Sequence, residues 1–488
     1  MTMNCLLIAG PDSLADNRRC ANWSKWARHR LTLLTLFMML SCLPSARAQI
    51  SASIKGIVTD PSGAPVPSAT VKAKNLETGA IRSSLTNDAG RYLVLSLPVG
   101  EYEVRVTKPS FQDAIRSGIN LVVGQEANVD LRLQVGTVSS EITVKEDAPM
   151  VSTTTSDISG LVGEQAVKEL PLNGRSYDLL LPLNPGIVNF TSQKTGGTGI
   201  SNSTTANNFA VSGNRPQQNI FLLNGVEYIG AAENNMQPGG SSGMLLGVDA
   251  VREFNVLRDS YSAELGKRPG GQVIIVTRSG SNQWHRAVFE FLRNNVLDAP
   301  NFFDQGSAPP FQRNQFGASL GGPVRKDKTF LFTDYEGFRQ NLHQTSVAFV
   351  PSLASRAAAA PSVQPLLNLW PTPAPGAQDF NGISQVFSSP PQTIREDFGT
   401  IRLDHIFSEK DSFAAIYTID DGGDVTATPL NPYSSDILTL RAQVLSLEET
   451  HIFSPAILNT ARFGFSRAGY FFTGEPTRAL QRRTFPDS

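Results

Sequence analysis

Histidine is the side chain in this sequence best suited to hold a metal or to move a proton, and its positions argue against both uses. His285, His343, His405 and His451 are isolated, and no H-E-x-x-H or H-x-x-E pair offers two zinc ligands. The chain also lacks a G-x-S-x-G nucleophile motif and a phosphate-binding glycine loop. We therefore predict no catalytic residue, no metal, no cofactor and no enzymatic activity.

The three cysteines, Cys5, Cys20 and Cys42, all lie near the start of the chain. A basic flank there precedes the apolar run Leu31–Leu43, and Ala46-Arg47-Ala48 follows it. Such a pattern predicts a secretory signal peptide over residues 1–48, with Ala46 and Ala48 as the small residues of the cleavage site. A membrane anchor is the alternative, but about 13 apolar residues fall short of the ~20 needed. Lipid attachment at Cys42 stays open as a variant.

The remainder of the chain contains no cysteine, which favours a bacterial envelope protein over an extracellular disulfide scaffold. The net charge of the whole chain, −1, gives no attraction to nucleic acid. With 40 glycines, 31 prolines and mostly alternating polarity, the fold class predicted is mainly β. No later apolar segment is long enough for a spanning helix, so a membrane-crossing form would be a β-barrel.

Residues 49–136 contain about seven short alternating strands separated by turns such as Asn87-Asp88-Ala89-Gly90, which predicts an antiparallel sandwich. The strings G-x-V-x-D-x-x-G-x-P, T-N-D-x-G-x-Y and L-P-x-G-x-Y-x-V resemble the carboxypeptidase regulatory-like domain. The resemblance implies a non-catalytic, transthyretin-like sandwich, and sugar binding only by analogy of fold. Tyr92 and Tyr102 are expected to pack in the core; stacking on a sugar is the alternative.

Residues 137–156 are predicted to be a linker that carries a short β-prone stretch. This stretch, Glu141-Ile142-Thr143-Val144-Lys145-Glu146, resembles a TonB box. The resemblance implies that it pairs as an added strand with a TonB-type energy-coupling protein, mainly through backbone hydrogen bonds. The alternatives are a last strand of the sandwich and a plain linker.

Residues 157–282 differ in pattern from the preceding strands: we predict a helix over 162–170 and a second helix over Gly247–Phe254. Four motifs follow in order: Asn173-Gly174-Arg175, Gly213-Asn214-Arg215, Asn224-Gly225 and a Gly270-Gly271 ending. Their order resembles the plug of TonB-dependent receptors, in the Oar-like branch, and implies a small α+β domain inside a barrel. Candidates for ion pairs between plug and barrel are Arg175, Arg215, Arg252, Arg258, Asp259 and Glu264. For each of them the alternative is a solvated surface charge.

From residue 283 onward the segments read as membrane strands with a two-residue period. Ala287, Phe289 and Phe291 share one face, with Arg286 and Glu290 opposite. The same alternation recurs in three later segments: Ile401, Leu403 and Phe407 against Thr400, Arg402 and Asp404; Phe413, Ala415, Tyr417 and Ile419 against Ser412, Ala414, Thr418 and Asp420; and Phe463 and Phe465 against Arg462 and Ser466. Residues 351–393 are expected to be a long extracellular loop. A soluble sandwich would alternate in a similar way.

A plugged barrel has about 22 strands and needs on the order of 400 residues. Roughly 200 remain after residue 283, enough for about seven or eight strands. We therefore expect residues 283–488 to be the first part of a transmembrane antiparallel barrel, in a gene fragment or a gene frameshifted near residue 477.

The function expected from this resemblance is energy-coupled uptake through the outer membrane. The implied partners are a TonB-type energy-coupling protein, outer-membrane lipid and an unknown substrate such as an oligosaccharide, a peptide or a metal chelate. The alternative is a secreted, non-catalytic carbohydrate-binding or adhesion module. No nucleic-acid partner is expected.

Overall fold

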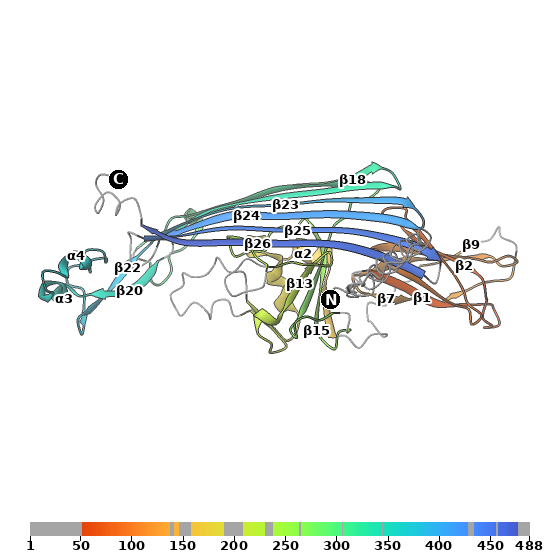
Figure 1. The fold of residues 1–488 in the computed structure, drawn as a ribbon, viewed down its shortest axis with the longest axis horizontal. Coiled ribbons are helices and arrows are strands. Elements are labelled where there is room, and N and C mark those ends of the chain that lie inside the picture. The colour runs from red at the N-terminus through yellow and green to blue at the C-terminus, as the bar shows by residue number, and fades with distance from the viewer. Residues whose placement is uncertain are drawn as a thin grey trace, which may run out of the picture. The chain divides into compact units, whose positions relative to one another are not determined.

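The computed structural model of the chain describes residues 51–136, 141–145, 158–189, 208–229, 238–262, 265–304, 306–343, 345–427, 434–454 and 457–476. Residues 49–488 cluster as one compact unit. The predicted signal peptide with Ala46 and Ala48, most of the linker, Glu146 and Glu264 lie outside the described residues. Three parts follow one another in the described chain: a sandwich, a central domain and a large curved sheet (Figure 1).

The sandwich consists of two sheets. One holds β4 (Arg91–Leu97), β1 (Ala52–Thr59) and β7 (Glu126–Asn128), with β8 (Leu131–Arg132) also paired to β1. The other runs in the order β3 (Ile81–Leu85), β2 (Thr70–Asn75), β5 (Gly100–Thr107), β6 (Asp113–Leu121) and β9 (Glu141–Lys145). Alternate residues of both sheets fill one apolar core, which confirms a sandwich. The prediction that it is antiparallel is wrong in part, because β7 and β8 pair in parallel with β1, and β9 pairs in parallel with β6.

Tyr92 and Tyr102 lie in that core. Tyr92 donates its hydroxyl proton to the carbonyl of Val129 at 2.6 Å, and Tyr102 donates to the carbonyl of Pro98 at 2.9 Å. Burial raises the pKa of both phenols. The packing role is confirmed, and sugar stacking on these two rings is wrong because both are covered.

The candidate TonB box forms strand β9, which pairs in parallel with β6. Glu141 lies opposite Asp113 and Lys145 lies opposite Ser117. This segment therefore forms the last strand of the second sheet, one of the alternatives that the sequence left open. Its pairing with β6 engages one edge of the strand only.

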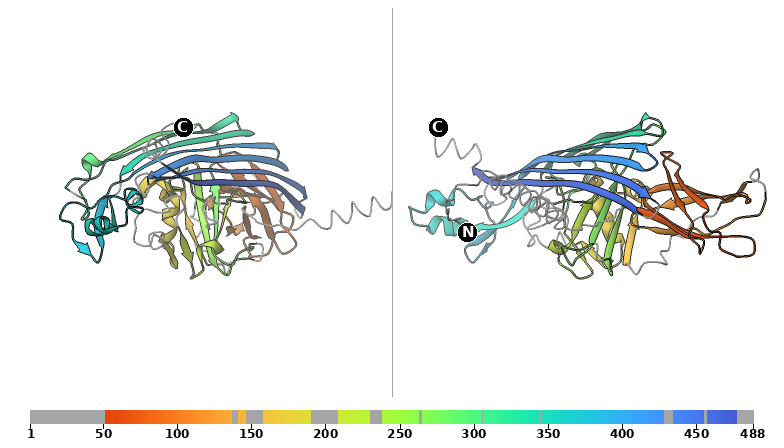
Figure 2. Two further views of the ribbon diagram at one scale, coloured as in Figure 1. Left: turned by 60° about the vertical axis from the view of Figure 1, so that its left-hand side comes forward. Right: turned by 45° about the vertical axis from the view of Figure 1, so that its right-hand side comes forward.

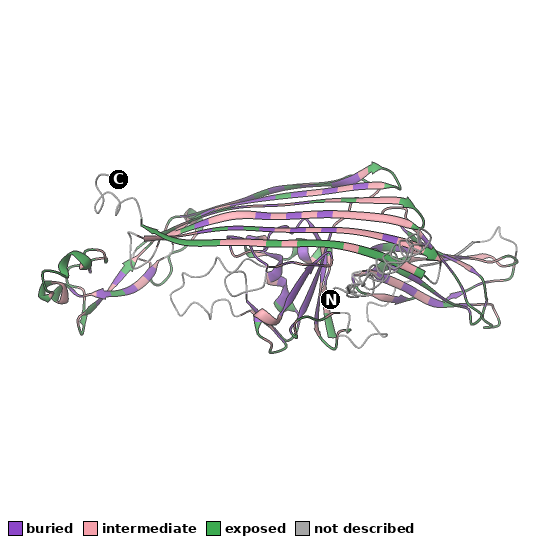
Figure 3. Cartoon of the chain, viewed as in Figure 1, coloured by how far each residue is buried: buried purple, intermediate pink, exposed green. Residues whose placement is uncertain are grey.

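The central domain, residues 158–282, is built on a five-stranded sheet. Its order is β10 (Ile158–Val162), β15 (Val251–Asp259), β16 (Gln272–Thr277), β13 (Ile220–Leu223) and β14 (Val226–Glu227). Around it lie α2 (Glu164–Glu169), the 3-10 turns η1 (Asn173–Arg175), η2 (Tyr177–Leu183) and η4 (Pro216–Gln218), and the pair β11 (Ile187–Asn189) and β12 (Phe209–Val211). Strands β13 and β16 are buried on both faces, as Figure 3 shows.

The first predicted helix of this domain is confirmed as α2, but the helix predicted over Gly247–Phe254 is wrong. Residues 251–259 form β15, which pairs with β10 on one side and β16 on the other. Val251, Phe254 and Val256 are buried there. Two sheet partners and β-branched valines favour a strand over local helical periodicity.

The large curved sheet, here called the wall, contains seven strands. In order they are β17 (His285–Asn294), β18 (Phe311–Arg325), β19 (Thr329–His343), β23 (Pro391–Ser408), β24 (Asp411–Ala427), β25 (Ser434–Ser454) and β26 (Ile457–Pro476). Each pairs antiparallel with the next. Figure 2 shows its concave side turned toward the central domain. Most of these strands are 15 to 21 residues long, longer than the ~10 residues with which a tilted strand crosses a bilayer.

Two faces of the wall differ as the alternation predicts. Ile401, Leu403 and Phe407 are exposed on the convex side, whereas Thr400 and Asp420 are buried on the concave side. Strand β17 has its alternation confirmed, but Phe289 and Phe291 face the central domain: their cross-strand partners are Gly317 and the buried Gln315.

Short hairpins join the wall strands at one end, and longer connections lie at the other. The predicted loop over 351–393 contains α3 (Leu353–Ala358), α4 (Gln364–Leu367), β21 (Asp379–Phe380) and β22 (Ile383–Ser388), the last paired with β20 (Ser346–Pro351). Within the described ranges, no helix combines the length and apolar composition required to cross a membrane.

A substitution of Gly56 tests the sandwich. A Cβ atom there would lie 1.9 Å from the carbonyl oxygen of Val129. Gly56→Ala should lower the free energy of unfolding of the fragment 51–136 by about 1–3 kcal/mol, measured by urea titration. Lys72→Ala, which removes an exposed side chain from β2, is the control and should change it by less than about 0.5 kcal/mol. Equal stability of the two variants would contradict this packing.

Candidate functional site: the seam between the central domain and the wall

The first sequence motif of the central domain lies directly against the wall. Gly174 and Arg175 both have positive φ, 72° and 54°, so the chain makes a tight left-handed turn there. A Cβ on Gly174 would lie 2.2 Å from the sulfur of Met244. The carbonyl of Gly174 accepts a hydrogen bond from Gln315 at 2.9 Å, and Arg313 donates to the side chain of Asn173 at 3.0 Å.

The turn aims the guanidinium of Arg175 between two carboxylates. Its Nη2 is 2.6 Å from Asp249 of the central domain, and its Nε is 3.3 Å from Glu336 of β19. The guanidinium carbon lies 3.9 Å from the ring centroid of Phe289. Because Glu336 is 1% exposed, this is a buried ion triad in which each charge depends on the others.

Residues 240–247 of the central domain supply backbone donors to the same surface. The amide of Ser242 donates to Glu396 at 2.6 Å, and the amide of Gly247 donates to Glu336 at 3.0 Å. A Cβ on Gly240 would lie 2.0 Å from a carboxylate oxygen of Glu396. These backbone amides add charge-assisted hydrogen bonds to Glu336, which Arg175 also contacts, and to Glu396, which has no ion pair among the described residues. We call these contacts, with the Arg175 triad, the seam.

Two apolar clusters lie beside the seam. Wall residues Leu438, Leu440, Ala442 and Val444 pack into the core of the central domain. Leu246 and Ala250 pack against Phe332, Phe338, Ile394 and Phe398. The central domain therefore contacts the wall through both polar and apolar surfaces.

Some carboxylates on the concave side of the wall have no hydrogen-bond partner. Asp334 is 3% exposed and Asp420 1% exposed, and neither oxygen of either residue has a hydrogen-bond partner within the part of the chain that the structure describes. Sequence analysis placed Asp420 on the polar face of its strand but missed Asp334, Glu336 and Glu396. The i, i+2 spacing of Asp334 and Glu336 was the available signal.

The other motif residues divide into two groups. Asn224 and Gly225 make a left-handed hairpin turn, with φ of 48° and 79°, and the Asn224 carbonyl accepts a hydrogen bond from Ser446 of the wall at 3.2 Å. Gly213, Asn214 and the exposed Arg215 form a turn within the central domain. Gly270 and Gly271 allow close approach of Gln218 and Val211. The residues of these last two motifs, 213–215 and 270–271, shape the central domain and make no described contact with the wall.

Arg252, predicted to pair with the barrel, instead joins the central domain to the sandwich. Its two terminal nitrogens donate to Glu77 at 2.7 and 2.6 Å. Burial alone would lower the pKa of Arg252, but the hydrogen bonds and charge of Glu77 outweigh it and raise that pKa. Of the other candidates, Arg258 contacts the carbonyl of Pro185, and Asp259 accepts from Ser212.

A second contact with the sandwich involves the next residue, Glu253, which accepts a hydrogen bond from the amide of Val123 at 2.5 Å. The register of β15 against β16 shifts between Val251 and Glu253, which marks a β-bulge. A bulge lets consecutive side chains reach the same neighbour. Burial raises the pKa of Glu253 to about 7, although the Val123 amide and Arg252 lower it.

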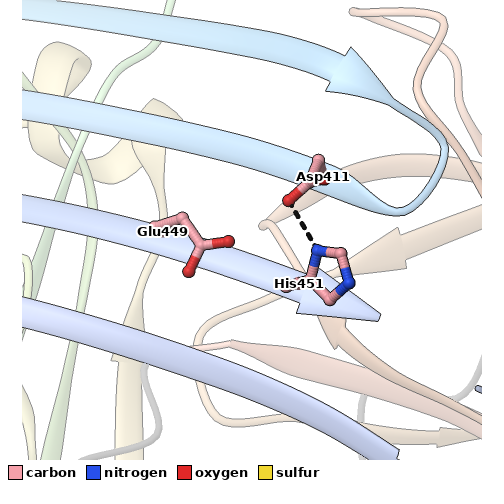
Figure 4. A group of neighbouring side chains, drawn as sticks. All are labelled: Asp411, Glu449 and His451. Atoms are coloured by element: carbon pink, nitrogen blue, oxygen red, sulfur yellow. Dashed lines mark hydrogen bonds and ion pairs between the residues drawn. The ribbon is translucent and has the colours of Figure 1, made fainter. Parts of the chain in front are cut away.

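His451, isolated in the sequence, has two acidic neighbours in space. Figure 4 shows Asp411 at the start of β24 opposite His451 on β25, with Glu449 two residues earlier. The His451 Nδ1 is 2.8 Å from Asp411, and one ligand atom from each residue lies within 4.8 Å of the others. A histidine nitrogen and two carboxylate oxygens are ligand types that a divalent cation accepts. However, all three side chains are half-exposed, and Asp411 and His451 already contact each other.

The comparisons with known proteins agree with this architecture. Residues 276–364 and 356–486 match the family described as outer membrane beta barrel domain, and residues 53–134 match the carboxypeptidase regulatory-like domain. The chain therefore carries an outer-membrane β-barrel domain behind a regulatory-like sandwich, and its location is the outer membrane.

One curated relative extends this result. The chain is 24% identical over 308 residues to the TonB-dependent transporter Oar of Myxococcus xanthus, and it is an Oar-like homologue of the TonB-dependent transporters. The match covers 60% of this chain but 27% of the relative, so the chain spans about a quarter of the relative's length. The family resemblance predicted from the sequence is confirmed.

Solved structures of outer-membrane receptors show weaker similarity. The ferric enterobactin receptor PfeA of Pseudomonas aeruginosa is 13% identical, with 64% of this chain and 46% of that chain covered and a TM-score of 0.35. The alcaligin receptor FauA of Bordetella pertussis is 13% identical, with 68% and 50% covered and a TM-score of 0.36.

Removal of the Arg175 charge tests the seam. Arg175→Met keeps an extended side chain over Phe289 but leaves Glu336 and Asp249 buried without their cation. The free energy of unfolding in detergent, measured with denaturant, should fall by about 3–5 kcal/mol. The matched control is Arg215→Met, which changes an exposed arginine of a neighbouring motif and should cost less than about 0.5 kcal/mol. Equal losses would rule out the triad as a stabilising contact.

The contact between Glu253 and the sandwich should depend on pH. Since folding raises this pKa from 4.5 to about 7, the contribution of the carboxyl is fully present below the lower value and is lost as pH rises through about 7. Wild-type stability should therefore decline between about pH 4.5 and about pH 7, and Glu253→Gln should show a smaller decline over the same range. The glutamine oxygen still accepts from Val123. Identical pH profiles for the two proteins would contradict the assignment.

Proposed function

We propose that this chain is part of a TonB-dependent transporter of the outer membrane, in which the central domain is the plug and the wall is part of the surrounding barrel. The observation that carries the proposal is the seam, where a domain built on its own five-stranded sheet is held against the concave side of an outer-membrane barrel sheet by an ion triad and backbone hydrogen bonds. The domain boundaries predicted from the sequence, at 136, 156 and 282, belong to this proposal.

A polar seam suits a plug that must move and return. Hydrogen bonds and ion pairs to the wall can be exchanged for bonds to water, whereas an apolar interface would have to be exposed outright. Asp334 and Asp420 are buried without described partners, so water entering the seam would solvate them. These carboxylates favour the side of the plug next to β19 and β24 as the place where a path opens.

The order of elements along the chain gives a route for force. Strand β9 is the candidate TonB box, and β10, the next described element, is an edge strand of the plug sheet. Tension on β9 reaches β10 first, then α2, and then the Arg175 turn. Peeling an edge strand breaks one ladder only, between β10 and β15. The partner in this step is a TonB-type energy-coupling protein.

The substrate class stays as the sequence left it: an oligosaccharide, a peptide or a metal chelate. The ferric enterobactin receptor and the alcaligin receptor are named for their own ligands, and those names do not identify the substrate of this chain. A secreted carbohydrate-binding or adhesion module loses its two stacking candidates, since Tyr92 and Tyr102 are core residues. A role in uptake involves no catalysis by this chain.

A single cysteine tests the coupling strand. All three natural cysteines lie at or before residue 42, so Thr143→Cys places one thiol in β9 of the processed chain. In cells, this thiol should form a disulfide with cysteines introduced along the binding strand of the coupling protein. Adding Ile142→Pro removes a backbone donor and should reduce the cross-link at least about fivefold.

The matched control for that experiment is Lys72→Cys, an exposed position on β2 of the same sheet. It should not cross-link above background. If Thr143→Cys gives no more product than Lys72→Cys, β9 is a structural strand of the sandwich and the coupling proposal fails.

A further inference from the structure

A cavity of about 180 Å³ lies where the sandwich, the central domain and the wall meet. Its lining comes from β3 and β5 of the sandwich, from β15 and β16, and from wall strands β23 to β26. It lies away from the Arg175 turn, and Arg175 does not line it; of the candidate residues in the sandwich and the central domain, Tyr102, Asn224 and Arg252 do. The cavity is therefore a site distinct from the seam.

Four arginines line the cavity, and three of them have carboxylate partners. Arg252 is paired with Glu77 at 2.6 Å, Arg402 with Asp404 at 2.8 Å, and Arg462 donates to Glu448 at 2.9 Å. The fourth, Arg82 on β3, donates through Nη2 to the hydroxyl of Ser412 at 3.0 Å. Within the described residues, Arg82 has no carboxylate within ion-pair distance.

Arg82 is also deeply buried, with 9% of its surface exposed. Its Nη1 has no hydrogen-bond partner in the part of the chain that the structure describes. Burial lowers the pKa of Arg82, while the charges of Tyr102, Asp411 and Glu448 raise it, and a guanidinium stays protonated near neutral pH. A buried cation with an unused donor is unfavourable unless an anion completes the site.

We propose that this cavity binds a small water-soluble anion through a carboxylate or phosphate group held by Arg82. A guanidinium offers parallel N–H donors that match the two oxygens of either group. Glu77, Asp404 and Glu448 are each engaged by their own arginine. The fourth carboxylate of the lining, Glu409, is exposed and makes no ion pair among the described residues, so Arg82 is the buried cation left to meet a ligand.

The ligand comes from the aqueous side and not from the bilayer. Ser412 and Glu448 lie on the face of β24 and β25 that carries the buried Thr418 and Val444, which is the concave side of the wall. Lipid headgroups meet the opposite face. Since Arg82 belongs to the sandwich and Ser412 to the wall, a bound anion fastens these two parts to each other.

Titration calorimetry of the full chain in detergent tests the site. Inorganic phosphate and succinate are added separately at constant chloride, which distinguishes the two ligand chemistries. At least one should bind saturably at one site per chain. Arg82→Gln should weaken that binding about tenfold or more, because the charge and the fork are both lost. Arg105→Gln is the matched control: Arg105 also belongs to the sandwich, pairs with Asp113 at 3.4 Å and does not line the cavity.

Arg82→Lys keeps the charge without the planar fork and serves if the glutamine variant does not fold. Its binding should be weaker than that of the wild type but measurable. A rise in unfolding temperature with the bound anion, present in the wild type and in Arg105→Gln, should be reduced in both Arg82 variants. Absence of saturable binding of both anions to the wild type overturns the proposal, and so does unchanged affinity in the Arg82 variants.

Discussion

The structure depends on one buried charge arrangement, the guanidinium of Arg175 between Asp249 and Glu336. Neither carboxylate can stay buried at low cost without the cation, and the cation reaches them only because two successive residues adopt positive φ. That requirement explains the glycine at 174, where a side chain would strike Met244. Residues 240–247 lie beside it, and the amides of Ser242 and Gly247 donate to Glu396 and Glu336.

Around this arrangement, the contacts between the central domain and the wall are of two physical kinds. The apolar clusters that include Leu438 and Phe398 resist separation because they would expose hydrophobic surface. The polar contacts lose little when water replaces the partner, provided that water has access. If the central domain acts as the proposed plug, it should open first along its polar side, where Asp334 and Asp420 are already unsatisfied among the described residues.

Sequence patterns were informative where the chemistry is local. Turn motifs, the alternation of Ile401 with Thr400, and the Asn173-Gly174-Arg175 motif all predicted real elements. They failed where the answer depends on distant partners. Glu336 contacts Arg175, and Glu396 accepts a hydrogen bond from Ser242; in both pairs the two residues lie more than a hundred positions apart in the sequence. Residues 247–254 have helical spacing, but β10 and β16 make them part of a strand. On β17, Phe289 packs against the guanidinium of Arg175 and therefore faces the central domain.

Strand β15 connects these observations mechanically. It lies between β10 and β16, so it borders the first ladder that tension from β9 would break. Its bulge sends Arg252 and Glu253 to the sandwich, while Val251 and Phe254 enter the core of the central domain. Displacement of the sandwich therefore acts on β15 directly, and through it on the edge that β10 occupies. Because protonation of Glu253 strengthens that attachment, the sandwich is a pH-dependent restraint on the same sheet that force along the chain would open.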